Sequence, residues 1–237
     1  MSEKPESLPP ISTSIEKPSW ADVILRGHKT FPDAHWQAQG RWSPDFKSFA
    51  VLVLGLAVFG FGEGLIYAAA IGNSPWTVLA EGIMLQTGLG LGVVTGLVSL
   101  TVLLLWIPLR EKPGVGTLMN VVVIAAVLQI TAEIVGTPSG YVAKTALAVF
   151  GVLLVGLGSA LYLTTNLGPG PRQGLMTSLH NRTGVRVSRV SFALEALVLL
   201  GGFLLGGTVG IGTVIFAAGI GRAIAFGLGL IARLAPA

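Results

Sequence analysis

Two short stretches decide the fold: IGNSPW at residues 71–76 and LGPGPR at residues 167–172. Each interrupts an apolar run with glycine and proline, and each is followed by a short apolar segment, at 76–86 and at 173–180. A helix that crosses a bilayer needs about 20 mostly apolar residues. These two segments therefore suit half-spanning helices better than full crossings.

The rest of the chain supplies longer apolar runs. Six of them are long enough to cross a bilayer, at 49–71, 91–109, 115–135, 142–165, 187–205 and 209–231. Charged residues make up only 11% of the 237 residues, against about 25% in a soluble domain. This composition excludes a nucleic-acid-binding domain and a typical cytosolic enzyme, and the absence of cysteine excludes a disulfide scaffold. We expect an all-α polytopic membrane protein whose main partner is the lipid bilayer.

A shift of 96 residues brings the two interrupting stretches into register. Gly72 and Pro75 then meet Gly168 and Pro171. Further matches pair Gly55 with Gly151, Gly60 with Gly156, Gly62 with Gly158, Thr87-Gly88 with Thr183-Gly184, and Gly114-x-Gly116-Thr117 with Gly210-x-Gly212-Thr213. The sequence thus predicts two repeats, at 49–136 and 137–237, each with three transmembrane helices and one short half-helix.

Loop charges favour an inverted arrangement of these repeats. Three spans are an odd number, so the second repeat would be inserted upside down relative to the first. With both termini in the cytoplasm, Arg110, Lys112 and the bases at 182–189 all fall on the cytoplasmic side, as the positive-inside rule requires. Eight spans with parallel repeats are the alternative, and they would place Arg110 and Lys112 outside.

Residues 1–48 are predicted to form a flexible cytoplasmic tail. Residues 1–49 contain six prolines and 12 of the 26 charged residues, six of each sign. Within the tail, residues 20–36 carry two tryptophans and several aliphatic residues, so this segment could lie on the membrane surface. A plain linker is the alternative, and the composition does not choose between them.

The interrupting stretches also have the features of a binding site. Pro75 and Pro171 suit the first turn of a helix, and Asn73 or Ser74 can cap the first short helix. A helix start presents free N–H groups and about half a unit of positive charge. Together with Arg172, two such starts near the membrane midplane would favour a small anionic or polar solute. Alternatively, these turns serve only packing.

Charged residues inside the apolar runs each need a partner or a function, because burial in lipid costs roughly 2.5–3.5 kcal/mol on insertion scales. Glu63 has glycines on both sides and no basic neighbour, so it is the candidate for a proton- or cation-linked site. Glu195 and Arg222 lie near the middle of the last two spans, where an ion pair between them is the structural alternative. Glu133 is expected at the interface.

No catalytic pattern emerges from the chain. The one histidine of the membrane part, His180, has no carboxylate near it in sequence, and phosphate-loop and zinc motifs are absent. We therefore expect no enzymatic activity, cofactor or metal. Rows of small residues such as Gly151, Gly156 and Gly158 are typical of closely packed membrane helices.

Three runs carry a family resemblance: Gly72-Asn73-Ser74-Pro75-Trp76, then Gln86-Thr87-Gly88-Leu89, and the most specific part, 104–120. They resemble the YczE-like bacterial integral membrane proteins, which are similar to the wider YitT group, and the likeness covers about residues 50–232. It implies a bacterial inner-membrane protein of unknown activity, sometimes linked to peptide-antibiotic production, with no catalytic residues to carry over. Thr77 stands where the family usually has an acidic residue, and the usual description has five spans rather than six.

Two hypotheses for function follow. In the first, the protein is a small-solute transporter or channel whose path is formed by residues near the two turns: Glu63, Asn73, Ser74, Pro75, Pro171, Arg172, Glu195 and Arg222. In the second, it is a non-transporting membrane regulator or scaffold that acts through a protein partner. The sequence leaves the solute, the coupling ion and an oligomer open.

Overall fold

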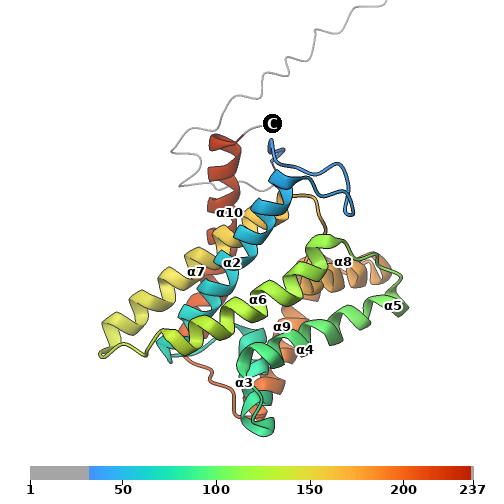
Figure 1. The fold of residues 1–237 in the computed structure, drawn as a ribbon. Coiled ribbons are helices and arrows are strands. Elements are labelled where there is room, and N and C mark those ends of the chain that lie inside the picture. The colour runs from blue at the N-terminus through green and yellow to red at the C-terminus, as the bar shows by residue number, and fades with distance from the viewer. Residues whose placement is uncertain (1–31, 236–237) are drawn as a thin grey trace, which may run out of the picture.

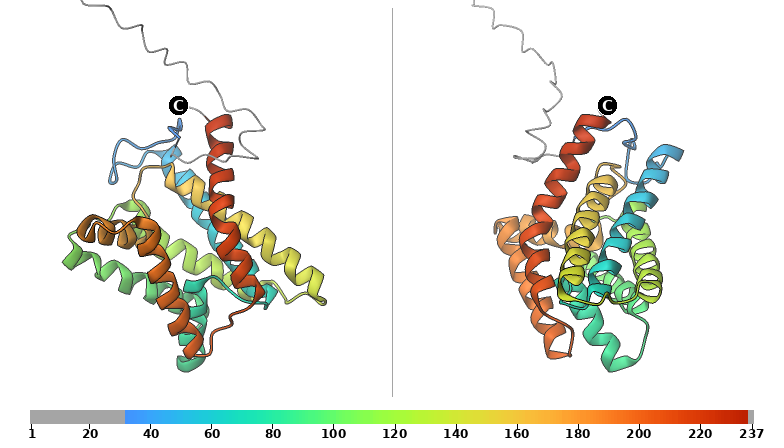
Figure 2. Two further views of the ribbon diagram at one scale, coloured as in Figure 1. Left: turned by 180° about the vertical axis from the view of Figure 1, so that it is seen from behind. Right: turned by 90° about the vertical axis from the view of Figure 1, so that its left-hand side faces the viewer.

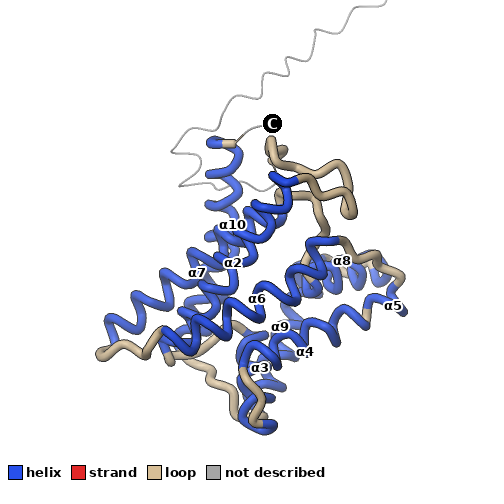
Figure 3. The backbone as a smooth tube through the Cα atoms, viewed as in Figure 1, coloured by secondary structure: helices blue, strands red, loops and turns tan. Residues whose placement is uncertain are grey.

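The computed structural model describes residues 32–235, which are helix or loop throughout (Figures 1 and 3). The helices are α2 (Phe46–Ala69), α3 (Pro75–Thr87), α4 (Leu91–Leu104), α5 (Trp106–Leu109), α6 (Val115–Ile134), α7 (Tyr141–Leu163), α8 (Pro171–Thr183), α9 (Val187–Leu204) and α10 (Ile211–Leu234). Six spans are long and apolar enough to cross a membrane, and they coincide with the six predicted runs. The all-α polytopic fold is therefore confirmed.

The two short helices are built alike. Both α3 and α8 have 13 residues, which at 1.5 Å per residue gives about 20 Å, less than the hydrocarbon core of about 30 Å. Each starts with proline after a glycine of positive φ, 114° at Gly72 and 115° at Gly168. Each ends at a left-handed glycine, Gly88 or Gly184. Equivalent backbone therefore recurs 96 residues apart, as the sequence matches predict.

Four long helices form a row in the order α10, α7, α2, α6 (Figure 2). At its centre α2 and α7 run in opposite directions with their backbones in contact. A Cβ atom added to Gly62 would lie 2.7 Å from the carbonyl oxygen of Gly151, and one added to Gly158 would lie 2.6 Å from that of Gly55. Only glycine permits this approach, which confirms the packing role predicted for these residues.

The two halves of the chain contact each other through equivalent positions. The Gly212 N–H donates to the Ile71 carbonyl at 2.8 Å, and the Gly116 N–H donates to the Leu167 carbonyl at 2.8 Å. Adding 96 to one partner and subtracting 96 from the other converts the first pair into the second. The short helices follow the same rule, because α3 packs on α9 of the second half and α8 packs on α4 of the first.

The outer surface of the helices is apolar. Large side chains on different spans are exposed, among them Leu54, Val122, Phe192, Leu204 and Val214. Such a surface is unfavourable in water and suits a lipid environment, since lipid chains are as apolar as leucine.

The described part of the tail packs on one end of the helices. The Trp36 indole N–H donates to Thr164 Oγ1 at 3.2 Å, and the Ala38 N–H donates to the Thr165 carbonyl at 2.9 Å. The chain enters α2 and leaves α10 at this same end (Figure 1). Most of the predicted surface segment 20–36 lies outside the described residues. Its last part, 32–36, contacts protein through Ala34 and Trp36.

Candidate functional site

Glu63 is a buried carboxylate on α2, held where that helix is packed most tightly. A Cβ atom on Gly62 would clash with α7, and one on Gly64 would lie 2.5 Å from Thr131 on α6. The carboxylate oxygen Oε2 accepts hydrogen bonds from Ser74 Oγ at 2.8 Å and Thr77 Oγ1 at 2.7 Å. The other oxygen, Oε1, is buried with no hydrogen-bond partner. One oxygen of this carboxylate thus has two hydrogen-bond donors, and the other oxygen has none.

A small cavity of about 20 Å³ lies beside Glu63. That volume holds about one water molecule. The polar lining consists of Glu63, Thr77, Thr95, Ser99 and Arg172, from four different helices. Among the lining residues, Arg172 carries the only charge besides that of Glu63.

Arg172 and Trp76 separate the small cavity from a larger one. They stand at equivalent positions, in the first turns of α8 and α3. The Arg172 guanidinium lies 5.6 Å from the centre of the Trp76 ring and 5.6 Å from that of Phe59. Cation–π contacts of this kind stabilise a cation by roughly 0.5–2 kcal/mol. Arg172 forms no ion pair with any residue that the structure describes.

The larger cavity has a volume of about 170 Å³ and mostly apolar walls. The first turns of both short helices open onto it through Pro75, Trp76, Arg172 and Gln173. Its other lining residues are Phe59, Val155, Ser159, Met176, Glu195, Phe216, Ile220, Gly221 and Ile224. A Cβ atom added to Gly221 would meet no atom within 4 Å, so this glycine faces open space.

The two cavities are equivalent under the shift of 96 residues. Seven lining residues of the small cavity have a counterpart in the lining of the large one. The pairs, small cavity first, are Glu63 with Ser159, Trp76 with Arg172, Thr77 with Gln173, Ser99 with Glu195, Ile124 with Ile220, Leu128 with Ile224, and Arg172 with Trp76. The carboxylate and the serine exchange places: the small cavity has Glu63 and Ser99, and the large cavity has Ser159 and Glu195. Sequence reasoning missed both serines, although the same shift pairs each of them with a glutamate.

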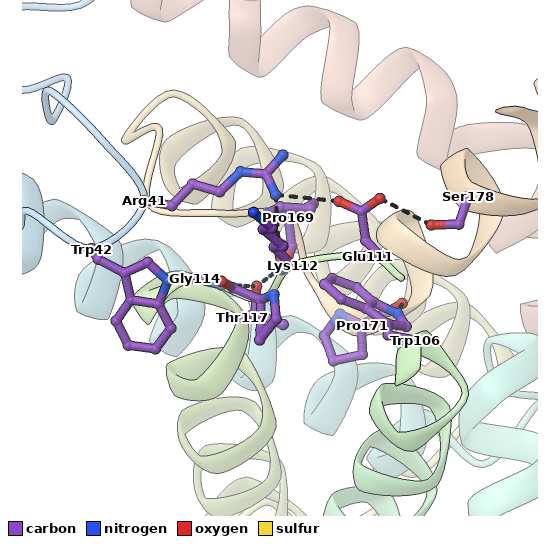
Figure 4. A network of polar contacts seen from close by, with 11 residues as sticks. Arg41, Trp42, Trp106, Glu111, Lys112, Gly114, Thr117, Pro169, Pro171 and Ser178 are labelled. Atoms are coloured by element: carbon purple, nitrogen blue, oxygen red, sulfur yellow. Dashed lines mark hydrogen bonds and ion pairs between the residues drawn. The ribbon is translucent and has the colours of Figure 1, made fainter. Parts of the chain in front are cut away.

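A polar network holds α8, and with it Arg172, against the tail and the loop before α6 (Figure 4). The Trp106 indole N–H donates to the Pro171 carbonyl at 3.1 Å, and Thr117 Oγ1 donates to the Pro169 carbonyl at 2.7 Å. Glu111 accepts from Arg41 at 3.2 Å and from Ser178 at 3.1 Å. Three of these residues, Trp106, Glu111 and Thr117, fall in the run 104–120, so the part of the sequence that carries the family resemblance helps to position the second turn.

The predicted site residues fall into two groups. Glu63, Ser74, Pro75, Arg172 and Glu195 all lie on or directly beside the two cavities. The remaining predicted residues, Asn73, Pro171 and Arg222, do not line either cavity.

These three residues have other surroundings. Asn73 Nδ2 donates to Glu81 Oε2 at 2.9 Å, away from the cavities. Pro171 is buried against Trp106. Arg222 is exposed on α10, and no ion pair joins it to Glu195. The structural alternative of a Glu195–Arg222 ion pair is therefore wrong, because Gly221 rather than Arg222 faces the cavity that Glu195 lines. Glu133 is exposed near the end of α6, as expected.

Comparisons with known proteins place the chain in a family. The family of unknown function DUF6198 matches residues 46–228. An uncharacterized protein of Haemophilus influenzae is 43% identical over 206 residues, covering 87% of this chain and 94% of its own. The uncharacterized membrane protein YczE of Bacillus subtilis is 31% identical over 183 residues, covering 73% and 82%. No solved structure matches. The chain thus belongs to the DUF6198 family of unknown function, and it is a relative of the membrane protein YczE.

Proposed function

We propose that this protein is a transporter or channel for small solutes, built from two inverted repeats. Three observations support the inverted arrangement: the antiparallel contact of α2 with α7, the exchange of equivalent hydrogen bonds between Ile71–Gly212 and Leu167–Gly116, and the equivalent cavities. In this proposal α3 and α8 are re-entrant half-helices. Inverted repeats with interrupted helices are a recurrent architecture of secondary transporters, which bind their solutes between the repeats.

The single observation that carries the proposal is Arg172, whose guanidinium lies on the wall of a mostly apolar cavity and forms no ion pair with any residue that the structure describes. Glu195 lines the same cavity and attracts this guanidinium from a longer distance. The starts of α3 and α8 add partial positive charge to the same wall. An apolar cavity of about 150 Å³ binds benzene, and the larger cavity here measures about 170 Å³. The solute that fits this combination is a small carboxylate with an apolar body of about that size.

The proposed orientation places both termini in the cytoplasm of a bacterial cell, with the protein in the inner membrane. Arg41 of the tail contacts Glu111 and the Lys112 carbonyl, so the tail and the loop 110–114 lie at the same end of the molecule. Arg182 also reaches this end, where it donates to the Pro108 carbonyl at 2.7 Å. The basic loops thus gather on one face, which the positive-inside rule assigns to the cytoplasm.

Proteoliposomes test the proposal. Uptake of radiolabelled benzoate and smaller carboxylates is measured with purified protein, and a neutral polyol serves as the control solute. We expect protein-dependent carboxylate flux that falls at least about tenfold in Gly221→Phe, whose side chain would fill the large cavity. The matched control is Gly136→Phe, because a Cβ atom at Gly136 also meets no atom within 4 Å but lies outside both cavities.

The regulator hypothesis predicts a different result. A scaffold would give no flux with any carboxylate, and its cellular phenotype would depend on the tail. Deleting residues 1–31 is the appropriate variant, because it keeps the hydrogen bonds that Trp36, Arg41 and Trp42 make to described residues. Flux that survives this deletion and is lost in Gly221→Phe supports the transporter, whereas equal flux in Gly221→Phe and Gly136→Phe would count against the site.

A further inference from the structure

We propose that the small cavity is a proton site, with Glu63 as the group that takes the proton, and that Arg172 links this protonation to the binding of a carboxylate in the large cavity. The proton site stands on the geometry around Glu63 alone. The link to a carboxylate rests on the proposed function.

The hydrogen bonds of Glu63 leave one oxygen free to take a proton. Ser74 and Thr77 both donate to Oε2, at 2.8 Å and 2.7 Å, whereas Oε1 has no partner and is buried. The adjacent cavity of about 20 Å³ has room for one water molecule, which can deliver a proton to Oε1 or remove it. The two hydroxyls keep the carboxyl group oriented in either charge state, because Oε2 remains an acceptor in both.

Arg172 is the one cation among the residues that line the small cavity with Glu63, and the same guanidinium also interacts electrostatically with Glu195 on the wall of the large cavity. The side of α4 contributes the hydroxyls of Thr95 and Ser99, and α6 contributes only Ile124 and Leu128. The ionisable residue of α3, Glu81, is bonded to Asn73 and Thr208 instead. A buried carboxylate without a compensating charge is strongly unfavourable and takes a proton instead. In this proposal the compensating charge is the Arg172 guanidinium, which lines the same small cavity.

Arg172 lies on the wall of both cavities, and this shared position couples them. When a carboxylate occupies the large cavity, the guanidinium pairs with it and compensates Glu63 less. Glu63 then takes up at Oε1 one proton that comes from hydronium in the bulk solvent and is relayed by the cavity water, which is left neutral. The added negative charge of the solute is balanced by this added proton. Linkage requires the reverse effect to be equal, so protonation of Glu63 strengthens carboxylate binding by the same factor. The consequence is movement of the anion together with a proton.

Infrared spectroscopy of the purified protein in lipid tests this inference without requiring transport. The C=O band of a protonated carboxyl group is followed as the pH is lowered, and the Glu63 band is identified by its absence in Glu63→Gln. Glu81→Gln is the matched control and should retain it. In Arg172→Gln the band should appear at a pH higher by at least about one unit, a tenfold change in proton affinity. Arg172→Lys keeps the charge and should shift it less.

Added benzoate tests the link between the cavities, with ¹³C at its carboxyl carbon so that its own band is displaced. We expect benzoate to raise the titration midpoint of the Glu63 band in the wild type and to leave it unchanged in Arg172→Gln. Two outcomes would overturn the proton site: Glu63→Gln removes no titrating band, or Arg172→Gln leaves the midpoint of the Glu63 band unchanged. Suppression of the band by sodium chloride at fixed pH would overturn it as well, because it would indicate a sodium site. A Glu63 band that titrates but ignores benzoate overturns the link alone, and the flux experiment then decides the proposed function separately.

Discussion

Two buried glutamates, Glu63 on α2 and Glu81 on α3, differ in how their oxygens are used. Glu81 accepts from Asn73 and from the Thr208 N–H with Oε2, and from Thr208 Oγ1 with Oε1. Glu63 accepts only with Oε2 and leaves Oε1 open beside a cavity. Both are almost fully buried, at 8% and 1% exposure for Glu81 and Glu63.

The difference teaches that burial alone does not identify a functional carboxylate. Glu81 ties the first turn, through Asn73, to Thr208 in the loop before α10, so it joins the two halves of the chain. A carboxylate whose partners all come from the protein is a structural brace. A carboxylate that has one oxygen without a hydrogen-bond partner and a cavity beside it has room to bind and release a proton or a water molecule.

The largest loss of stability is expected when Glu81, the carboxylate that joins the two halves, is removed. Glu81→Ala leaves the buried Asn73 Nδ2 without its acceptor and removes two hydrogen bonds from the exposed Thr208. An unsatisfied buried group costs about 1–3 kcal/mol and each lost hydrogen bond about 1 kcal/mol, so we expect Glu81→Ala to lower the free energy of unfolding by about 2–4 kcal/mol. Thermal unfolding of the purified protein in detergent measures this loss.

Glu63→Ala is the matched variant for this measurement. It removes an acceptor from only two hydroxyls, which can turn towards each other, since Ser74 Oγ and Thr77 Oγ1 are already 3.1 Å apart. Its destabilisation should therefore be the smaller of the two. An equal loss of stability in the two alanine variants would remove the distinction between brace and site.

An intermediate effect is expected from the isosteric change at the open carboxylate. Glu63→Gln keeps an acceptor oxygen for Ser74 and Thr77 and places its NH₂ group towards the cavity. Its stability should stay within about 1 kcal/mol of the wild type. Carboxylate flux, however, should lose its dependence on an imposed pH gradient, whereas Glu81→Gln should keep that dependence in whatever protein remains folded.

Sequence reasoning predicted the helices well because their signals are local. The length of each apolar run distinguished six spans from two short helices, and the glycine and proline of the two turns marked where the short helices begin. Glu63 was singled out as a charge inside an apolar run and Arg172 as a cation at the second turn, and the structure brings both onto the wall of the small cavity.

The sequence did not predict which face of each helix points towards the cavities. Successive residues point about 100° apart around a helix, so Gly221 lines the large cavity and its neighbour Arg222 does not. The internal repeat contains part of this information. If the shift of 96 residues is applied to the charged side chains as well as to the turns, it pairs residues that line the two cavities. The clamp of Trp106 and Glu111 on α8 depends on contacts between residues more than 60 positions apart, which no local pattern reports.

The smallest effect is expected at a third carboxylate, Asp45, which lies outside the spans and caps α2. Asp45 Oδ1 accepts from the Ser48 N–H at 3.2 Å, and Ser48 Oγ accepts from the Asp45 N–H at 3.0 Å. Hydrogen bonding by Ser48 lowers the pKa of Asp45 below its ordinary value of 3.8. Because the folded-state pKa is the lower one, the cap is stabilising above that value and its contribution is lost as the pH falls through the folded-state pKa.

The stability gap between the wild type and Asp45→Ala should therefore be constant near neutral pH and shrink as the pH drops below 3.8. Asp45→Asn, which caps a helix without a charge, should show no such pH dependence relative to Asp45→Ala. Thermal unfolding in detergent across this pH range measures both differences. A gap that persists unchanged at the lowest pH would mean that the protonated Asp45 side chain caps α2 as well as the ionised one, and it would contradict the prediction.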